Sequence, residues 1–331
     1  MIRTKEDLMY FGKIACALTA IATVLLSQPA NAADWPRRPV TIVVPLGAGG
    51  NTDMMARLGA QRLSEKFGQP FVVENRPSAG GALGTGQVAA AAPDGYTILF
   101  SPSSMLLLTP MVQKVPFDAD KQLVPVVNVG TGTQMIAIRR SLPVKTLGEF
   151  LAHAKANPGK LNYVIAGANN IAHLAPALLF ARAGVDVVMI PAKSGPQAVQ
   201  DLMAGQVDFY FGNTSELLPH ADSDKVRLIA VGTPQRIPVA PDLPTVAESF
   251  PGFEFSSWNG FSVPAGTPEE IIAAIHTEIT ALAKSDAVRE RLTKLGIVPG
   301  GLTREETAAV FKKDKENFAA SVKAAGITPA Q

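Results

Sequence analysis

The sequence predicts an α/β protein with two domains, each a mostly parallel sheet flanked by helices. Two observations support this prediction. Runs of β-branched residues alternate with helical patterns along most of the chain, which is typical of βα units and parallel sheets. The chain also has 331 residues, of which 47% are hydrophobic. That is enough to bury a sizeable core, and at this length two domains are the default expectation.

The first 32 residues predict a secretory signal. Basic residues at 3, 5 and 13 precede or border the apolar run IACALTAIATVLL at residues 14–26, which is too short to span a bilayer. Run length and flanks therefore argue against a retained membrane anchor. Ala30 and Ala32 form a small-x-small pair, so we expect cleavage after Ala32 and a periplasmic location. Cys16 lies in the signal, so the mature chain has no cysteine and must be held together by its core.

The charge of the chain is close to balanced, with 30 Lys and Arg against 28 Asp and Glu. No polybasic run is present, so we expect no nucleic-acid partner. The four histidines stand apart at positions 153, 173, 220 and 276. They predict no metal cluster.

The first predicted strand is VTIVV at residues 40–44, a β-branched run typical of a buried strand. The helical pattern that follows places Met55, Leu58, Leu63 and Phe67 on one face. Further strands of the first half are predicted at residues 71–74, 97–100, 124–129 and 135–139.

The second half keeps the same alternation. Strands are predicted at residues 161–165, 185–190, 207–211 and 226–231, and helices at 147–156, 174–183 and 198–204. The proline-rich stretch at residues 236–253 predicts an irregular surface segment. A last helical block is expected to begin with Thr267 as N-cap and Pro268 at the first helical position.

The glycine-rich stretch GAGGNTD after the first strand has two interpretations. Gly47 and Gly49 match the first two glycines of a dinucleotide-binding loop, and Glu74 stands about where an acid would meet the ribose. Thr52, however, stands where the third glycine belongs. The other interpretation is a carboxylate site, because an anion at a strand-to-helix turn meets free backbone N–H groups and the positive end of the helix dipole.

The carboxylate interpretation names specific residues. Gly49 and Gly50 let the backbone turn its amides toward a ligand. Asn51, Thr52 and Asp53 are plausible helix caps that could also contact ligand, and for Asp53 the two roles are equally weighted. A charged Asp53 beside the ligand would favour one that carries an ammonium group or arrives with bridging water. Hydroxyls after the third strand could add hydrogen bonds, and these belong to Ser101, Ser103 and Ser104.

Several motifs together resemble the extracytoplasmic solute receptors of tripartite tricarboxylate transporters, the Bug-type family. They are VPLGAGGNTDMMAR, VVENRPSAGGALGTGQVAAAAPDGYTILF, LPVKTLGEFLAHAKANPGKLNY, LMAGQVDFYF and DLPTVAES, in this order. The resemblance implies a type II-like periplasmic-binding-protein fold with a ligand cleft between the domains. It also implies closure around a small carboxylate, with no cofactor and no catalysis. We place the first domain at residues 33–133 plus 260–331 and the second at 134–259.

In the second domain the resemblance implies further ligand-binding residues. Tyr163, Gly167 and His173 match the family, and the expected binding set there is Gly167, Asn169, Asn170, His173 and Asp208. Other positions depart from the family pattern. Asn169, Asn170 and Ile171 replace glycine and hydroxyl residues, Ala192 replaces tyrosine, Ser194 replaces glycine, and Gly212 replaces aspartate. For His173, packing or capping of its own helix is the expected role, ahead of ligand contact.

The sequence therefore predicts a monomeric periplasmic receptor that captures a small carboxylate, such as a di- or tricarboxylate, an amino acid or an aromatic acid. Its expected partners are membrane transporter subunits, or it acts as a sensor. The alternative is a nucleotide-dependent oxidoreductase, which export disfavours. A secreted hydrolase has almost no support, because neither a G-x-S-x-G nor an H-E-x-x-H motif is present.

Overall fold

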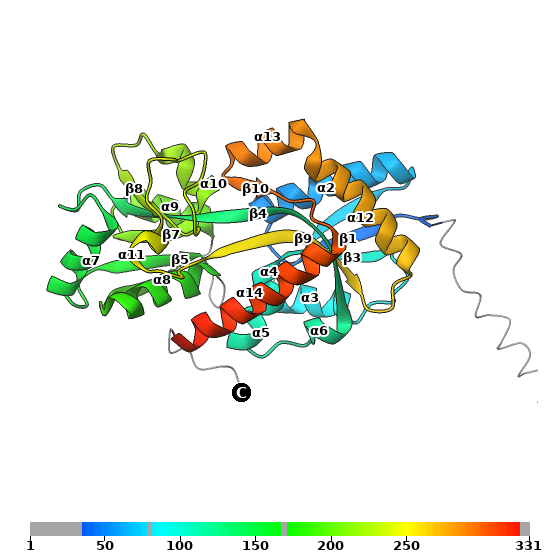
Figure 1. Ribbon diagram of the computed structural model, residues 1–331, viewed down its shortest axis with the longest axis horizontal. Coiled ribbons are helices and arrows are strands. Elements are labelled where there is room, and N and C mark those ends of the chain that lie inside the picture. The colour runs from blue at the N-terminus through cyan, green and yellow to red at the C-terminus, as the bar shows by residue number, and fades with distance from the viewer. Residues whose placement is uncertain (1–34, 78–80, 167–170, 193, 325–331) are drawn as a thin grey trace, which may run out of the picture.

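The computed structural model describes residues 35–77, 81–166, 171–192 and 194–324. Two α/β lobes lie side by side and are joined by long strands that run from one to the other (Figure 1). The predicted signal and its cleavage site after Ala32 lie outside the described residues. No helix in the described part of the chain has both the length and the apolar character needed to cross a membrane.

The strands are hydrogen-bonded in the order β2-β1-β3-β9-β4-β7-β5-β6, and β8 and β10 also pair with β4. Their bounds are β1 (Val40–Val44), β2 (Phe71–Asn75), β3 (Thr97–Pro102), β4 (Leu123–Arg139), β5 (Asn162–Ala166), β6 (Val188–Ala192), β7 (Phe209–Asn213), β8 (Val226–Val231), β9 (Ser256–Pro264) and β10 (Ile297–Pro299).

In the first lobe, β1 lies between β2 and β3, and all three strands are parallel. The four apolar residues of β1, Val40 and Ile42 to Val44, are fully buried between helices on both faces, which explains the β-branched apolar character of this sequence. The helices of this lobe are α2 (Asn51–Phe67), α3 (Ala82–Ala89), α4 (Ser103–Leu107), α5 (Thr109–Val112), α6 (Ala119–Gln122), α12 (Glu269–Lys284) and α13 (Asp286–Lys294). On one face, α2 and α12 bury Met55 and Ile275 against Phe261 of the sheet.

In the second lobe, β5 lies between β6 and β7, again in parallel. Its helices are α7 (Leu147–Ala156), α8 (Ile171–Ala183), α9 (Gly195–Met203), α10 (Thr214–Leu217), η3 (Leu218–His220) and α11 (Val246–Ser249). Phe150 and Phe180 pack their rings against Phe209 at centroid distances of 5.0 and 5.1 Å. These aromatic contacts fix α7 and α8 on one face of the sheet.

The long strand β4 passes from the first lobe to the second. Residues up to Thr133 pair with β9 and β10, whereas residues from Gln134 onward pair with β7 and β8. The sequence predicts two strands here, at 124–129 and 135–139, but the structure has one. The glycines between them allow close approach of β10, because a Cβ on Gly130 would lie 2.8 Å from the Cγ2 of Ile297. Gly130 and Gly132 thus lie within one continuous strand, at a place where another strand comes close to the backbone.

The chain returns to the first lobe at the start of β9. The amide of Phe255 donates to the carbonyl of Gly232 in the second lobe, and the next residue, Ser256, pairs with Thr133. The boundary expected between residues 259 and 260 thus falls inside β9.

The last helix, α14 (Arg304–Ala324), crosses the lower side of Figure 1 and packs against both lobes. Its residues Phe318 and Val322 belong to a buried apolar cluster that draws side chains from both lobes. The two lobes are therefore linked by β4, by β9 and by this helix.

The start of α12 differs slightly from the prediction. The helix begins at Glu269 with Pro268 as its N-cap, and the Thr267 hydroxyl donates to the Pro264 carbonyl at 2.7 Å. The prediction of Thr267 as N-cap was therefore wrong by one position.

Candidate functional site

The loop after β1 ends at the amino end of α2, a helix of 17 residues. Gly49 has φ +86°, a left-handed conformation that favours glycine, and Gly50 is the N-cap without a side-chain cap. A Cβ added at Gly47, Gly49 or Gly50 would meet nothing within 4 Å. The glycines therefore leave an open surface next to the first backbone N–H groups of the helix, as an anion site requires.

Asp53 holds this loop in place. One carboxylate oxygen accepts the Gly49 amide at 3.0 Å, and the Arg57 guanidinium bonds both oxygens at 3.0 to 3.1 Å. Burial acts to raise the pKa of Asp53. Hydrogen bonds from Arg57 and Gly49 outweigh this effect, so the pKa lies below its usual value. Asp53 is consequently ionised, and its charge is balanced by Arg57. Arg57 was not among the predicted site residues, although it stands at i+4 to Asp53, the ordinary spacing of a helical ion pair.

Neighbouring side chains fix the loop and the helix start. Thr52 is buried and donates its hydroxyl to the Asn259 side-chain oxygen at 2.7 Å, which joins α2 to β9. Arg57 also donates to Asn75 at 3.1 Å, and Asn75 donates to the Leu46 carbonyl at 3.1 Å. Asn51, the first residue of α2, is partly exposed. Of the predicted residues, Gly49 to Asp53 thus form one continuous and well-anchored element.

The three predicted serines are buried at the junction of β3, α4 and β9. The Ser103 hydroxyl lies 3.2 Å from that of Ser257 and donates to Asp314 at 3.5 Å. The Ser104 amide donates to the Ser257 hydroxyl at 3.2 Å. The Ser101 side chain is 1% exposed, and its hydroxyl has no hydrogen-bond partner among the described residues. These serines therefore lie beside β9, one of the strands that join the lobes, and beside α14.

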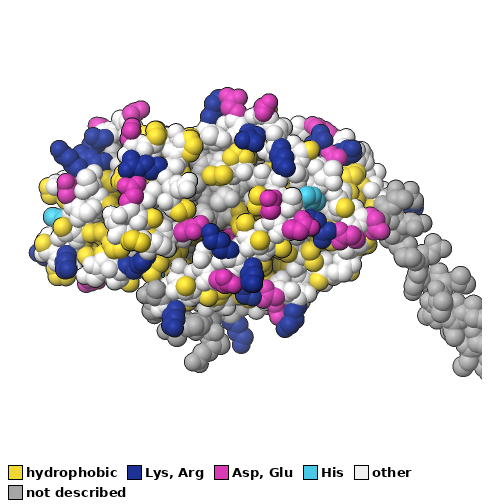
Figure 2. Space-filling model, in the orientation of Figure 1, with side chains coloured by type: hydrophobic (Ala, Val, Ile, Leu, Met, Phe, Trp, Pro, Cys, Tyr) yellow, Lys and Arg dark blue, Asp and Glu magenta, His cyan; other side chains and the backbone are white. Residues whose placement is uncertain are grey.

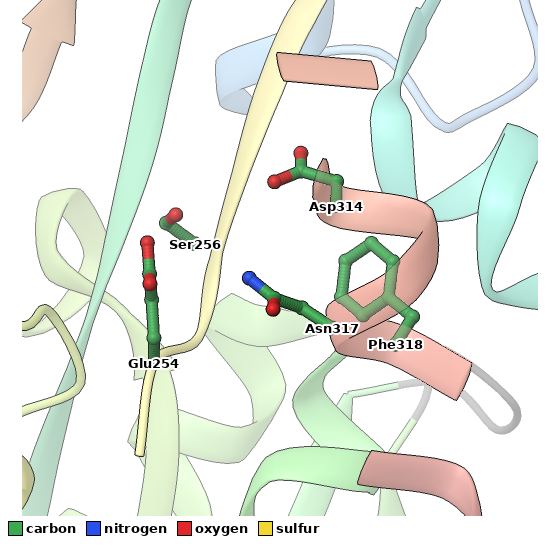
Figure 3. Close-up of a pocket in the computed structure, with 5 residues that line it drawn as sticks. All are labelled: Glu254, Ser256, Asp314, Asn317 and Phe318. Atoms are coloured by element: carbon green, nitrogen blue, oxygen red, sulfur yellow. The ribbon is translucent and has the colours of Figure 1, made fainter. Parts of the chain in front are cut away.

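A small pocket lies next to this junction and has room for about one water molecule. Figure 3 shows its lining, in which Ser256 is the first residue of β9, Glu254 lies in the segment just before it, and the other residues come from α14: Asp314, Asn317 and Phe318. Burial and the nearby Glu254 carboxylate raise the pKa of Asp314 to about 6, against the opposing effect of Lys313. A carboxyl group that titrates near neutral pH therefore lies where the lobes connect.

Of the residues expected to bind ligand in the second lobe, His173 and Asp208 lie within the described part of the chain. Gly167, Asn169 and Asn170 lie outside the described residues. His173 is in the first turn of α8 and half-buried, and burial lowers its pKa.

Asp208 lies at the opposite edge of the second sheet, where β5 and β7 begin. Its carboxylate accepts from the Arg139 side chain at 2.5 Å and from the Asn162 amide at 2.8 Å. The Asp208 amide donates back to the Asn162 side chain at 2.9 Å. Asp208 thus ties three strands together where β5 and β7 begin, at the opposite ends of these strands from α8 and α10, which follow them.

The carboxyl end of β7 carries polar residues that were not predicted from the sequence. Thr214 begins α10, and its hydroxyl lies 2.8 Å from that of Thr133 on β4. Thr133 in turn donates to the Gly296 carbonyl of the first lobe at 2.5 Å. Glu216 accepts from Tyr210 and Asn213, each at 2.9 Å. The sequence did contain one signal for these residues. Gly212 stands where the family pattern has aspartate, which indicated an altered environment at the end of this strand.

The features of a dinucleotide site are not assembled. Glu74, the candidate for ribose binding, accepts from Arg76 at 2.5 Å, two residues further along the chain. No group of three or more His, Cys, Asp or Glu side chains is placed to hold a metal within the described ranges. Figure 2 shows basic and acidic side chains interspersed over the face in view, in line with the balanced charge.

Comparisons with known proteins place these features in context. A family model described as "Tripartite tricarboxylate transporter family receptor" matches residues 55–326. Among solved structures, Rpa4515 of R. palustris with adipate is 32% identical with a TM-score of 0.83, covering 89% of this chain and 99% of its own. The periplasmic binding protein BugD is 33% identical with a TM-score of 0.79, covering 90% and 100%. MatC of Rhodopseudomonas palustris with bound malate is 31% identical with a TM-score of 0.77, covering 88% and 100%. The predicted two-domain α/β periplasmic-binding-protein fold is confirmed.

Proposed function

Because the chain belongs to the tripartite tricarboxylate transporter receptor family, we propose that it binds a small carboxylate between its lobes and delivers it to membrane transporter subunits. It is a solute-binding receptor of the periplasmic type. We place the mature protein in the periplasm as a monomer that begins at Ala33, after removal of the signal. No cofactor and no catalytic step enter this proposal.

The observation that carries the proposal is the uncapped amino end of α2 beside the open glycine loop. Asp53 and Arg57 balance each other there, so the helix end presents a net positive potential to a ligand. Hydrogen bonds to a charged group contribute about 1.5–3 kcal/mol each, and a few of them are sufficient for micromolar affinity. Dicarboxylates in two structural relatives, adipate and malate, support this ligand class.

The mechanism we propose is hinge closure. A ligand bound at α2 would complete its contacts with the carboxyl ends of β5, β6 and β7, and these contacts would stabilise the closed form. The change of strand partners at Thr133 and Gln134 supports one domain boundary at this position. The pairing of Ser256 with Thr133 supports a return crossing that is slightly earlier than residue 260.

A thermal-shift screen of residues 33–331 tests the proposal. The panel would contain dicarboxylates, tricarboxylates, amino acids, aromatic acids and NADH. A ligand at 100 times its Kd should stabilise the protein by about 2.7 kcal/mol, which raises the Tm by several degrees. If NADH or a non-carboxylate shifted the Tm while every carboxylate left it unchanged, the proposed ligand class would be wrong.

A further inference from the structure

Glu216 is the acidic group of α10, the short helix that follows β7. Its two carboxylate oxygens accept separate hydrogen bonds, one from the Tyr210 hydroxyl and one from the Asn213 side chain, each at 2.9 Å. Burial and the Glu216 charge raise the pKa of Tyr210 well above its usual value, so the phenol keeps its proton and donates. The carboxylate is therefore held in one orientation while each oxygen retains a free acceptor direction.

Two glycines make room for this arrangement. A Cβ at Gly195, the first residue of α9, would collide with the Glu216 carboxylate. A Cβ at Gly212 would collide with the Tyr210 ring. The carboxylate thus lies against the amino end of α9, a position where the carboxylate of a ligand could otherwise bind. The chain supplies its own anion at this place.

Within the described ranges, the charge of Glu216 has no cation paired with it. None of the described Lys, Arg or His side chains forms an ion pair with Glu216, whereas Asp53 in the first lobe is paired with Arg57. A second acceptor lies nearby. Gln134 pairs with Asn213 in the β4–β7 ladder, is 4% exposed, and its Oε1 has no hydrogen-bond donor among the residues that the structure describes. Directly opposed residues in a ladder project to the same face of the sheet.

This group of acceptors lies close to the junction of the lobes. Thr214, two residues before Glu216, contacts Thr133 on the crossing strand, and Thr133 bonds the Gly296 carbonyl. Figure 1 shows α10 at the junction of the lobes, beside β10. Glu216 and Gly195 also lie at the carboxyl ends of parallel strands, the edge where open α/β sheets bind their ligands.

We propose that Glu216 determines the ligand class, so that the receptor takes a carboxylate whose far end carries an ammonium group and disfavours a second carboxylate. This inference rests on the proposed function, since it requires the first carboxylate to bind at α2. A ligand of this type meets donors at the α2 end and acceptors at the α10 end. A second carboxylate would instead be placed beside a fixed carboxylate that forms no ion pair with any described side chain, and like-charge contacts of this kind discriminate strongly.

Isothermal titration calorimetry with matched probes tests the inference. Butanoate, 4-aminobutanoate and succinate have four carbons and differ at the far end, and hexanoate, 6-aminohexanoate and adipate repeat the comparison with six. In at least one series we expect the wild-type protein to bind the amino acid at least tenfold more tightly than the dicarboxylate. Glu216→Gln keeps the shape and removes the charge, so it should reduce this ratio at least tenfold. Glu65→Gln, on the exposed side of α2, is the matched control and should leave the ratio unchanged.

The outcomes separate the two proposals. If the wild-type protein binds dicarboxylates as tightly as the amino acids, or if Glu216→Gln leaves the ratio unchanged, Glu216 does not set the ligand class. The relative affinities of the wild-type protein for amino acids and dicarboxylates decide the first of these outcomes, even if Glu216→Gln folds poorly. If none of the six probes binds the wild-type protein or Glu216→Gln, while a compound other than a carboxylate does, the proposed function itself is wrong.

Discussion

The Arg57 guanidinium lies 3.0 Å from the Asp53 carboxylate and balances a charge that is 5% exposed at the start of α2. This pair determines the electrostatics of the first-lobe loop. With both carboxylate oxygens occupied by Arg57 and Gly49, Asp53 anchors the loop and does not present an isolated negative charge to a ligand.

Replacing Arg57 should therefore affect both stability and binding. Arg57→Ala leaves the Asp53 carboxylate without its cation, and because Arg57 is half exposed we expect a loss of about 1–2 kcal/mol in unfolding free energy. Carboxylate affinity should also fall at least tenfold, since the loop would gain a net negative charge. Urea denaturation and calorimetry measure the two effects. Arg289→Ala, at an exposed position of α13, should change neither; unchanged affinity in Arg57→Ala would contradict the proposed role of the pair.

The link between α2 and β9 gives a second prediction. Thr52→Val removes the donor to Asn259 and leaves a buried acceptor without a partner, so unfolding free energy should fall by about 1–3 kcal/mol. Thr277→Val, on the exposed face of α12, is the matched control and should stay within about 0.5 kcal/mol of wild type. Equal effects of the two variants in urea denaturation would show that the Thr52 bond contributes little.

Local patterns in the sequence predicted the elements well. The predicted strands 40–44 and 226–231 and the helix 147–156 have the observed bounds, because periodicity and β-branched runs reflect the burial of each short segment. The continuous crossing strand β4 was not predicted. Its glycines look like a break until the close approach of β10 is known.

The candidate site was predicted less completely, for a related reason. The loop from Gly49 to Asp53 is local, and its position at a helix start follows from the glycine pattern. The partners of the predicted serines are distant in sequence, since Ser103 meets Ser257 and Asp314 only after β9 and α14 have packed. Likewise, Glu216 lies against Gly195 from another βα unit. Contacts of this kind depend on tertiary packing, which single-sequence patterns do not report.

The buried Asp314 predicts a pH dependence of stability. Its pKa in the folded state is about 6, above the usual 3.8, so the folded protein binds this proton more tightly than the unfolded chain does. The protonated group is accommodated at low pH, and stability is lost as the pH rises from about 4 to 6. Asp314→Asn should then stabilise the protein by about 1–2 kcal/mol at pH 7.5 and have little effect at pH 4.

Urea denaturation at the two pH values measures this difference. Glu254→Gln removes the neighbouring charge that helps to raise the pKa, so it should shift the transition toward lower pH. If Asp314→Asn changed the unfolding free energy equally at pH 4 and pH 7.5, the titration of Asp314 would not be the cause.

The last prediction concerns Gly212. A substitution at this position tests the packing of Tyr210 without changing the charge of Glu216. A methyl group at residue 212 would collide with the Tyr210 ring, which is buried and held by its bond to Glu216. Gly212→Ala should therefore destabilise the protein by about 1–3 kcal/mol, the usual cost of overpacking a core. Gly148→Ala is the matched control, since Gly148 lies in α7 with nothing within 4 Å of the added methyl. That change should be neutral or stabilise by up to about 1 kcal/mol.

A double-mutant cycle then assigns the cause. Tyr210→Ala removes the ring that the new methyl would meet, so Gly212→Ala should cost little in the Tyr210→Ala background, and the two changes should be strongly non-additive. Unfolding free energies of the four proteins in urea provide the coupling. Additive costs would mean that Gly212 is required by something other than the Tyr210 ring. Strong coupling would instead explain why glycine stands at this position: the aromatic ring that positions Glu216 occupies the space of any side chain at residue 212.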